Sequence, residues 1–167
     1  MTNMSSRLHE KKMTTAPHLV SLTLGEQRYA LSLAQVERVI RALEITSLPK
    51  APEIIMGVIN VRGKVIPVVN VRRRFQLPER EISLSDQIII SRTSRRQVAL
   101  IVDEVNGVIE LPEHSVINAG NILPHLEYVE GVVKLRDGMI LIHDLDRFLS
   151  LEEETCLSDA LAGTEKQ

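Results

Sequence analysis

Short apolar runs alternate with turn residues along most of this chain, and this pattern predicts a β protein. The runs are rich in β-branched residues, which favour extended backbone. Gly25, Gly63, Gly107 and Gly138 mark turns between the runs. Several runs are apolar at nearly every position, so we expect both of their faces to be covered. The predicted strands are 18–24, 28–33, 64–69, 86–91, 96–102 and 137–143.

Four stretches predict helices instead. Three of them are short, at 32–39, 70–75 and 143–149. The first of these begins with Ser32 followed three residues later by Gln35, which fits a capping box. The longest helix is expected over 151–162, because Ser150 and Glu153 form a second capping box and an apolar stripe that includes Leu157 follows. Residues 163–167 are expected to fray.

The chain also contains an internal repeat. The segment GVINVRGKVIPVVNVRRRF (57–75) aligns without gaps on GVVKLRDGMILIHDLDRFL (131–149), and 29–40 aligns on 98–109. The offsets are 74 and 69 residues. Two related units are therefore predicted, the first over about 18–84 and the second over about 85–150. Each unit has the size of a minimal β-barrel, and two packed barrels would share a core and form a groove between them.

Composition narrows the class of protein. Apolar residues make up 44% of the 167 positions and charged residues 25%, which is typical of a globular chain. Cys156 is the only cysteine, so we expect no disulfide framework and a reducing compartment. The polar start predicts a disordered tail over 1–16, and no apolar run approaches the length of a membrane span. We therefore expect a cytoplasmic protein without direct membrane insertion.

The residues give no sign of an enzyme. No two histidines fall at metal-ligand spacing, and there is no nucleophile motif, phosphate loop or dinucleotide fingerprint. Asp144 and Asp146 are interpreted as the capped start of a short helix, and His143 as a solvated or locally bonded imidazole. We therefore predict no catalytic residue, no metal and no cofactor.

Nucleic-acid binding is the alternative from a different class, because small barrels bind single strands. The basic residues that favour it are Arg62, Lys64, Arg72, Arg73, Arg74, Arg92, Arg95 and Arg96. Against it stand a net charge of -2 and only four aromatic residues, two tyrosines and two phenylalanines. The run Arg72–Arg74 is interpreted as the solvated face of a short helix. Protein–protein recognition, without nucleic acid as a partner, fits the residues better.

The motifs quoted above carry a family resemblance. The 57–75 segment, with YALSLAQVERVI (29–40) before it and VALIVDEVNGVIEL (98–111) after it, resembles the CheW family of chemotaxis coupling proteins. The resemblance covers residues 17–150. It implies an all-β fold with short helices, namely two intertwined five-stranded Src-homology-3-like β-barrels (the CheW-like fold), followed here by a C-terminal helix.

The resemblance also implies a function. CheW-like proteins are non-enzymatic adaptors that couple chemoreceptor cytoplasmic tips to the regulatory domain of the histidine kinase CheA. They are expected to be monomers in isolation that assemble into rings in membrane-associated receptor arrays. A coupling protein of a parallel, non-flagellar chemosensory system is the alternative within the family.

The same resemblance suggests interaction residues. Val36 and Arg62 occupy positions linked to receptor binding, Arg62 at the groove between the barrels. Core packing for Val36 and an intramolecular bond for Arg62 remain the alternatives. Ile45 and Gly57 fall near the expected kinase contact, although Gly57 equally fits a need for a tight backbone. Ile122 stands where the family often has an aromatic residue, in a loop expected to make a second kinase contact.

Overall fold

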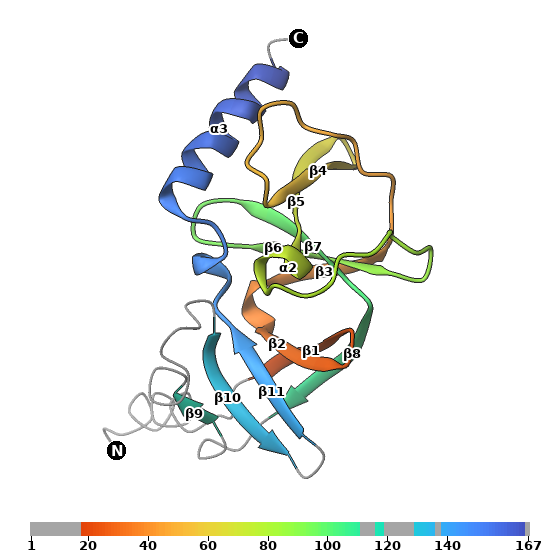
Figure 1. Cartoon of the computed structure of the whole chain (residues 1–167), viewed down its shortest axis with the longest axis vertical. Coiled ribbons are helices and arrows are strands. Elements are labelled where there is room, and N and C mark those ends of the chain that lie inside the picture. The colour runs from red at the N-terminus through yellow and green to blue at the C-terminus, as the bar shows by residue number, and fades with distance from the viewer. Residues whose placement is uncertain (1–17, 111–115, 119–128, 136–137, 166–167) are drawn as a thin grey trace, which may run out of the picture.

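The computed structural model describes residues 18–110, 116–118, 129–135 and 138–165 (Figure 1). The strands within these residues are β1 (His18–Leu24), β2 (Gln27–Ser32), β3 (Val36–Arg41), β4 (Ile55–Val61), β5 (Lys64–Val69), β6 (Gln87–Arg92), β7 (Gln97–Val102), β8 (Glu104–Glu110), β9 (Val116–Asn118), β10 (Val129–Leu135) and β11 (Gly138–His143). The helices are η1 (Leu33–Gln35), α2 (Val71–Arg74), η4 (Leu145–Arg147) and α3 (Leu151–Glu165).

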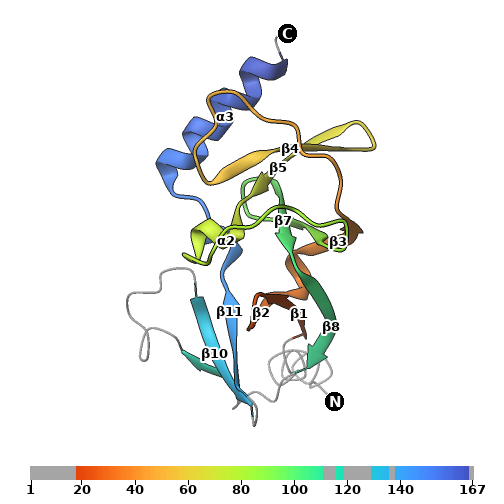
Figure 2. The same cartoon turned by 45° about the vertical axis from the view of Figure 1, so that its right-hand side comes forward.

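The strands form two sheets, with α3 beside the upper one (Figures 1 and 2). Sheet A has the order β8-β1-β2-β11-β10-β9, and sheet B has the order β3-β6-β7-β5-β4. All-β architecture with short helices and a C-terminal helix is therefore confirmed. Each strand predicted from the sequence lies within one residue of an observed strand at either end.

The repeat is confirmed, and the two sheets are copies of one another with strands exchanged. At the offsets of the repeat, β1 to β5 correspond to β6, β7, β8, β10 and β11. Replacing each strand of sheet B by its counterpart gives the order β8-β1-β2-β11-β10, and sheet A has β9 in addition. The parallel pairings also repeat. Val68 pairs with Ala99 in sheet B, and their repeat counterparts Ile142 and Ala30 pair in sheet A.

This exchange moves the boundary between the structural units. Sheet B is built from 36–102, whereas sheet A combines 18–32 with 104–143. The expected division near residue 84 falls between β5 and β6, which both belong to sheet B. It therefore does not separate one sheet from the other. The two units are intertwined, as the resemblance implied.

Two of the predicted helices differ from the structure. Only Leu33–Gln35 of the expected helix 32–39 is helical, as the 3-10 turn η1, and Ser32 makes no side-chain capping bond. Val36 begins strand β3 instead, because pairing with β6 favours the extended form of its β-branched residues. At the other end, α3 continues to Glu165 and is three residues longer than expected. Its capping box is confirmed by reciprocal bonds between Ser150 and Glu153.

The main core lies where the two sheets and α3 meet. Leu31 from sheet A, Leu100 from sheet B and Leu157 from α3 are each almost fully buried in it. Burial of such side chains stabilises the fold by roughly 1.5–3 kcal/mol each. Smaller clusters fill the interior of each sheet, around Ile140 in sheet A and Ile88 in sheet B. The shared core therefore joins the two units and the helix into one body.

An aromatic cluster sits within this region and includes a histidine. The rings of Tyr29, Phe75 and Phe148 surround His143, with Phe75 the nearest at a centroid distance of 4.1 Å. His143 is only 2% exposed, so the sequence-based interpretation of a solvated imidazole is wrong. Its Nε2 has no hydrogen-bond partner within the described residues. Burial lowers the pKa of His143 to about 3, and the ring is therefore neutral at ordinary pH.

Candidate interaction surfaces

Val36 lies at the start of β3, an edge strand of sheet B. It follows η1 directly, and its N–H donates to the carbonyl of Leu33. The side chain is partly buried and packs against the main core. Val36 therefore has a structural role, and only part of its surface is available to a partner.

Ile45 and Gly57 are twelve residues apart in the sequence but lie side by side, Gly57 on β4 and Ile45 in the segment before it. Thr46 and Val58 exchange two backbone hydrogen bonds of 2.8 and 2.9 Å, which bring the segment before β4 onto the strand. Gly57 is buried with φ +153, and a Cβ there would lie 2.8 Å from Ile45 Cγ2 and closer still to the Thr46 carbonyl oxygen. The tight backbone expected as one alternative for Gly57 is therefore present.

Arg62 lies in the turn between β4 and β5. Arg62 and Gly63 both have positive φ, +53 and +85, as type I′ hairpin turns require. The side chain is exposed, and within the described residues its guanidinium has no ion-pair partner. The turn is at the end of sheet B that lies away from sheet A, rather than between the two units (Figures 1 and 2). The remaining residue, Ile122, lies outside the described residues.

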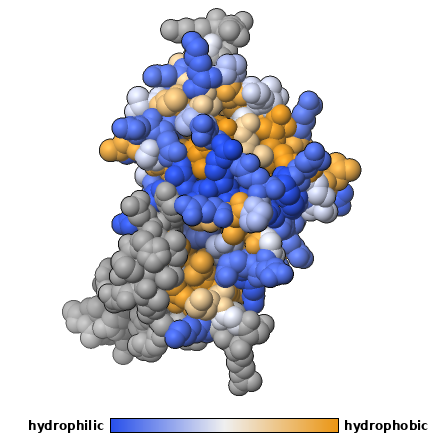
Figure 3. Space-filling view, in the orientation of Figure 1, coloured by the Kyte–Doolittle hydropathy of each residue, from blue (hydrophilic) through white to orange (hydrophobic). Residues whose placement is uncertain are grey.

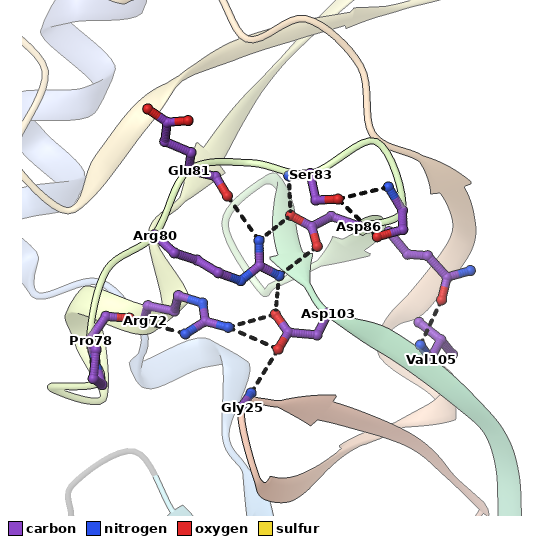
Figure 4. A network of polar contacts seen from close by, with 11 residues as sticks. Gly25, Arg72, Pro78, Arg80, Glu81, Ser83, Asp86, Asp103 and Val105 are labelled. Carbon is purple, nitrogen blue, oxygen red and sulfur yellow. Dashed lines mark hydrogen bonds and ion pairs between the residues drawn. The ribbon is translucent and has the colours of Figure 1, made fainter.

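A network of partly buried charged side chains joins the two sheets, and no local sequence pattern predicts it. Asp103, between β7 and β8, accepts two hydrogen bonds from Arg72 on α2, of 2.7 and 2.8 Å. Arg80 bridges Asp103 and Asp86 with bonds of 2.6 Å to each (Figure 4). The N–H of Gly25, in the β1–β2 turn, also donates to Asp103. The network therefore links α2, the loop before β6, and both sheets.

Two opposing effects act on these carboxyl groups. Burial raises the pKa of Asp103, but hydrogen bonds from Arg72, Gly25 and Arg80 outweigh it and leave the pKa below its ordinary value. Asp86 behaves in the same way, because bonds from Arg80 and the Ser83 N–H outweigh its burial. Both groups are therefore ionised at neutral pH and hold the arginines in place.

The arginines of α2 do not form a solvated face, which corrects the sequence-based interpretation. Besides the bond from Arg72 to Asp103, Arg73 pairs with Glu79 and Arg74 with Glu153 on α3. Five of the eight basic residues that favoured nucleic acid have carboxylate partners: Arg72, Arg73, Arg74, Arg92 and Arg96. A hydrophilic belt crosses the middle of the molecule, near α2 (Figure 3). Pairing with carboxylates neutralises these five arginines, which disfavours a phosphate-binding surface.

Comparison with known proteins decides the family. Residues 18–153 match the CheW family, described as a CheW-like domain. The chain belongs to the CheW-like family. The chemotaxis protein CheW of Bacillus subtilis (strain 168) is 32% identical over 150 residues, covering 89% of this chain and 90% of that protein. The chemotaxis protein CheW of Thermotoga maritima is 31% identical over 132 residues, covering 78% and 86%.

A solved structure supports the same assignment. The crystal structure of the scaffolding protein TtCheW from Thermoanaerobacter tengcongensis aligns with a TM-score of 0.75 at 34% identity. The alignment covers 83% of this chain and 95% of that one. The CheW-like fold expected from the sequence motifs is thus confirmed.

Exposed aliphatic residues recur at equivalent positions in the two units of this CheW-like chain. Val39 on β3 and Val108 on β8 are 38% and 55% exposed, and they are related by the repeat. Val65 on β5 and Met139 on β11 are 49% and 48% exposed and are also related by it. Each sheet therefore carries one exposed aliphatic residue of each pair.

The part of the chain that the structure describes lacks two further features. No group of three or more histidine, cysteine or acidic side chains there is arranged to hold a metal ion. None of the helices in the described part of the chain combines the length and apolar character that a membrane span requires.

Proposed function

We propose that this CheW-like protein couples chemoreceptor cytoplasmic tips to the histidine kinase CheA in a chemosensory pathway. The observation that carries the proposal is the CheW-like match over 18–153, together with a 34% identical structural relative described as a scaffolding protein. The names of the matched relatives point to chemotaxis. The chain would act as a non-enzymatic adaptor, without a cofactor.

The exposed aliphatic residues that recur on both sheets support an adaptor role. A protein that joins two partners needs two places to bind them, and each sheet carries a pair of exposed aliphatic residues. Aliphatic contacts surrounded by polar residues are typical of reversible protein–protein interfaces. The protein would be a cytoplasmic monomer in isolation and would join rings when recruited to membrane-associated receptor arrays. Analytical ultracentrifugation, alone and with both partners, tests this assembly.

Receptor binding is assigned to Val36 and Arg62. Arg62 is exposed and has no ion-pair partner within the described residues, so its planar fork is available to bond carboxylates or carbonyls of a receptor tip. Arg62→Asn removes the charge while tolerating the positive φ. Val36 is a weaker probe, because polar substitutions there would also disturb the core.

A pull-down with a receptor signalling fragment tests the receptor assignment. We expect Arg62→Asn to reduce receptor capture several-fold and to leave kinase capture unchanged. Arg95→Asn is the matched control, since Arg95 is also an exposed turn arginine without an ion-pair partner in the described part of the chain. Equal receptor capture by the two variants would exclude Arg62 from the contact.

Kinase binding is assigned to Ile45, Gly57 and Ile122. Gly57 is buried, so its contribution would be to let Ile45 and Thr46 pack against β4. Calorimetry with the CheA regulatory domain should show weaker binding for Ile45→Ala and, at the second contact, for Ile122→Ser. Binding equal to that of the parent in both variants would remove these residues from the interface.

A further inference from the structure

A groove runs between α3 and the segment before β4. Its volume is about 1040 Å³. Leu48, Val58 and Ala160 contribute apolar surface to it, and Leu151, at the start of α3, is 69% exposed beside it. Figure 3 shows hydrophobic and hydrophilic side chains interleaved over the upper part of the molecule, where Figure 1 places α3 and the segment before β4. The groove is thus an apolar channel with polar edges.

The helical wall of this groove is held firmly. Leu157 is fully buried beneath α3, and ion pairs from Arg74 to Glu153 and from Arg96 to Glu154 fix its first turns. Both pairs are largely shielded from solvent, with side chains between 10% and 24% exposed. A preformed wall of this kind favours binding, because little ordering is required when a partner docks.

Two acidic side chains edge the groove from α3. Glu152 and Asp159 are exposed, and neither has an ion-pair partner within the described residues. Since they are seven residues apart, they lie on similar faces of the helix and about 10.5 Å apart along its axis. Opposite them, Lys50 contributes one positive charge, so the groove keeps a net negative edge.

We propose that this groove binds a basic amphipathic helix of a partner protein. Its apolar face would cover Leu151 and the floor, while two lysines or arginines seven positions apart would pair with Glu152 and Asp159. A helix is about 10–12 Å wide, so two turns occupy roughly 800–1200 Å³, comparable with the groove. This mode of recognition, with a helix in an apolar groove, is common among protein interfaces.

The groove borders the segment assigned to the kinase, because its lining residues Thr46 and Val58 directly follow Ile45 and Gly57. The match to the CheW-like family ends at residue 153, whereas much of the helical wall, including Cys156 and Asp159, lies beyond it. The far wall, Thr46–Lys50, falls within the match. The helical extension therefore converts a family surface into a groove and would give this chain a further partner.

A dye-labelled synthetic peptide provides the first test. The peptide is a helix of about 15 residues built from leucine, alanine and lysine, with lysines seven positions apart on one side. We expect fluorescence anisotropy to show binding that weakens with added salt. Glu152→Lys with Asp159→Lys should raise Kd at least about tenfold. Thr155→Trp should also weaken binding, because it fills the groove without changing its charge.

Matched controls separate the groove from general charge effects. Glu26→Lys with Glu104→Lys makes the same change in net charge at exposed sites on sheet A and should change Kd less than about twofold. Cys156, the only cysteine, lines the groove, so bound peptide should slow its labelling by a maleimide. Equal binding of a glutamate-substituted peptide, equal binding by the Glu152/Asp159 variant, or no binding at all would overturn the proposal. If the parent protein forms a dimer and Thr155→Trp abolishes it, the occupant of the groove is a second copy of this chain. That result would also overturn the proposal.

Discussion

Replacing Asp103 by asparagine tests whether the partly buried charge network stabilises the fold. Asp103 accepts four hydrogen bonds, two from Arg72, one from Arg80 and one from Gly25. Asparagine keeps one acceptor oxygen, but it removes the negative charge and leaves two arginines without a full partner. Breaking a buried ion pair costs about 3–5 kcal/mol. Because Asp103 is 25% exposed, solvent screening lowers this cost. We therefore expect the free energy of unfolding to fall by about 2 kcal/mol.

Urea unfolding followed by circular dichroism measures this loss. For a chain of this length, 2 kcal/mol corresponds to a fall in Tm of about 4–8 °C. Glu53→Gln is the matched control, since Glu53 is 95% exposed and its contact with Arg73 is 3.9 Å long. We expect the control to change the free energy of unfolding by less than about 0.5 kcal/mol. If Asp103→Asn unfolds at the same urea concentration as the parent, the network does not stabilise the fold.

Acidification provides a second measurement of the same network. The pKa values of Asp86 and Asp103 lie below those of the unfolded chain. Their contribution to stability is therefore complete above about pH 4 and is lost as the pH falls through the folded-state pKa values. Asp103→Asn should unfold with a smaller dependence on pH in this acid range, and an unchanged dependence would contradict the assigned ionisation.

Three further substitutions test the packing. Gly57→Ala should destabilise the fold by about 1–3 kcal/mol, because the added Cβ would overlap the Thr46 carbonyl oxygen. An unchanged midpoint of urea unfolding would show that the segment before β4 moves to make room. Folded His143 titrates near pH 3 and the unfolded residue near 6.5, so stability should fall as the pH drops between these values, by up to about 1.4 kcal/mol per unit. His143→Phe should remove this slope, and a slope that persists would assign it to another group. Leu157→Ala should cost about 2–5 kcal/mol and speed maleimide labelling of Cys156 as α3 loosens, whereas an unchanged labelling rate would mean that Leu157 does not hold the helix.

The local pattern of the sequence predicted the strands and helices better than it predicted which strands pair with one another. Strands were found because β-branched runs end at glycine turns, and α3 because Ser150 and Glu153 cap each other. The repeat revealed which strands are equivalent. The repeat could not reveal whether a strand pairs with a strand of its own unit or of the other unit, because its apolar pattern is the same in both cases. The repeat alone therefore did not predict the exchange of strands, which the family resemblance implied and the structure shows.

The charged residues show the same limit. The sequence of a run such as Arg72–Arg74 is the same whether its side chains face water or pair with carboxylates. The partners of Arg72 and Arg74 are 31 and 79 residues away, so no local spacing identifies them. Val36 was assigned to a helix because Ser32 and Gln35 mimic a capping box, but pairing with β6 outweighed that local signal.

The exchanged strands have a consequence for the way such a protein could have arisen. A polypeptide that stopped near residue 84 would contain β1 to β5 but would lack β7 and β11, the parallel neighbours of β5 and β2. Two such polypeptides could supply these neighbours to each other, as in a domain-swapped dimer. The present chain is equivalent to that dimer with its subunits fused, and neither half would be expected to survive separation as a stable monomer.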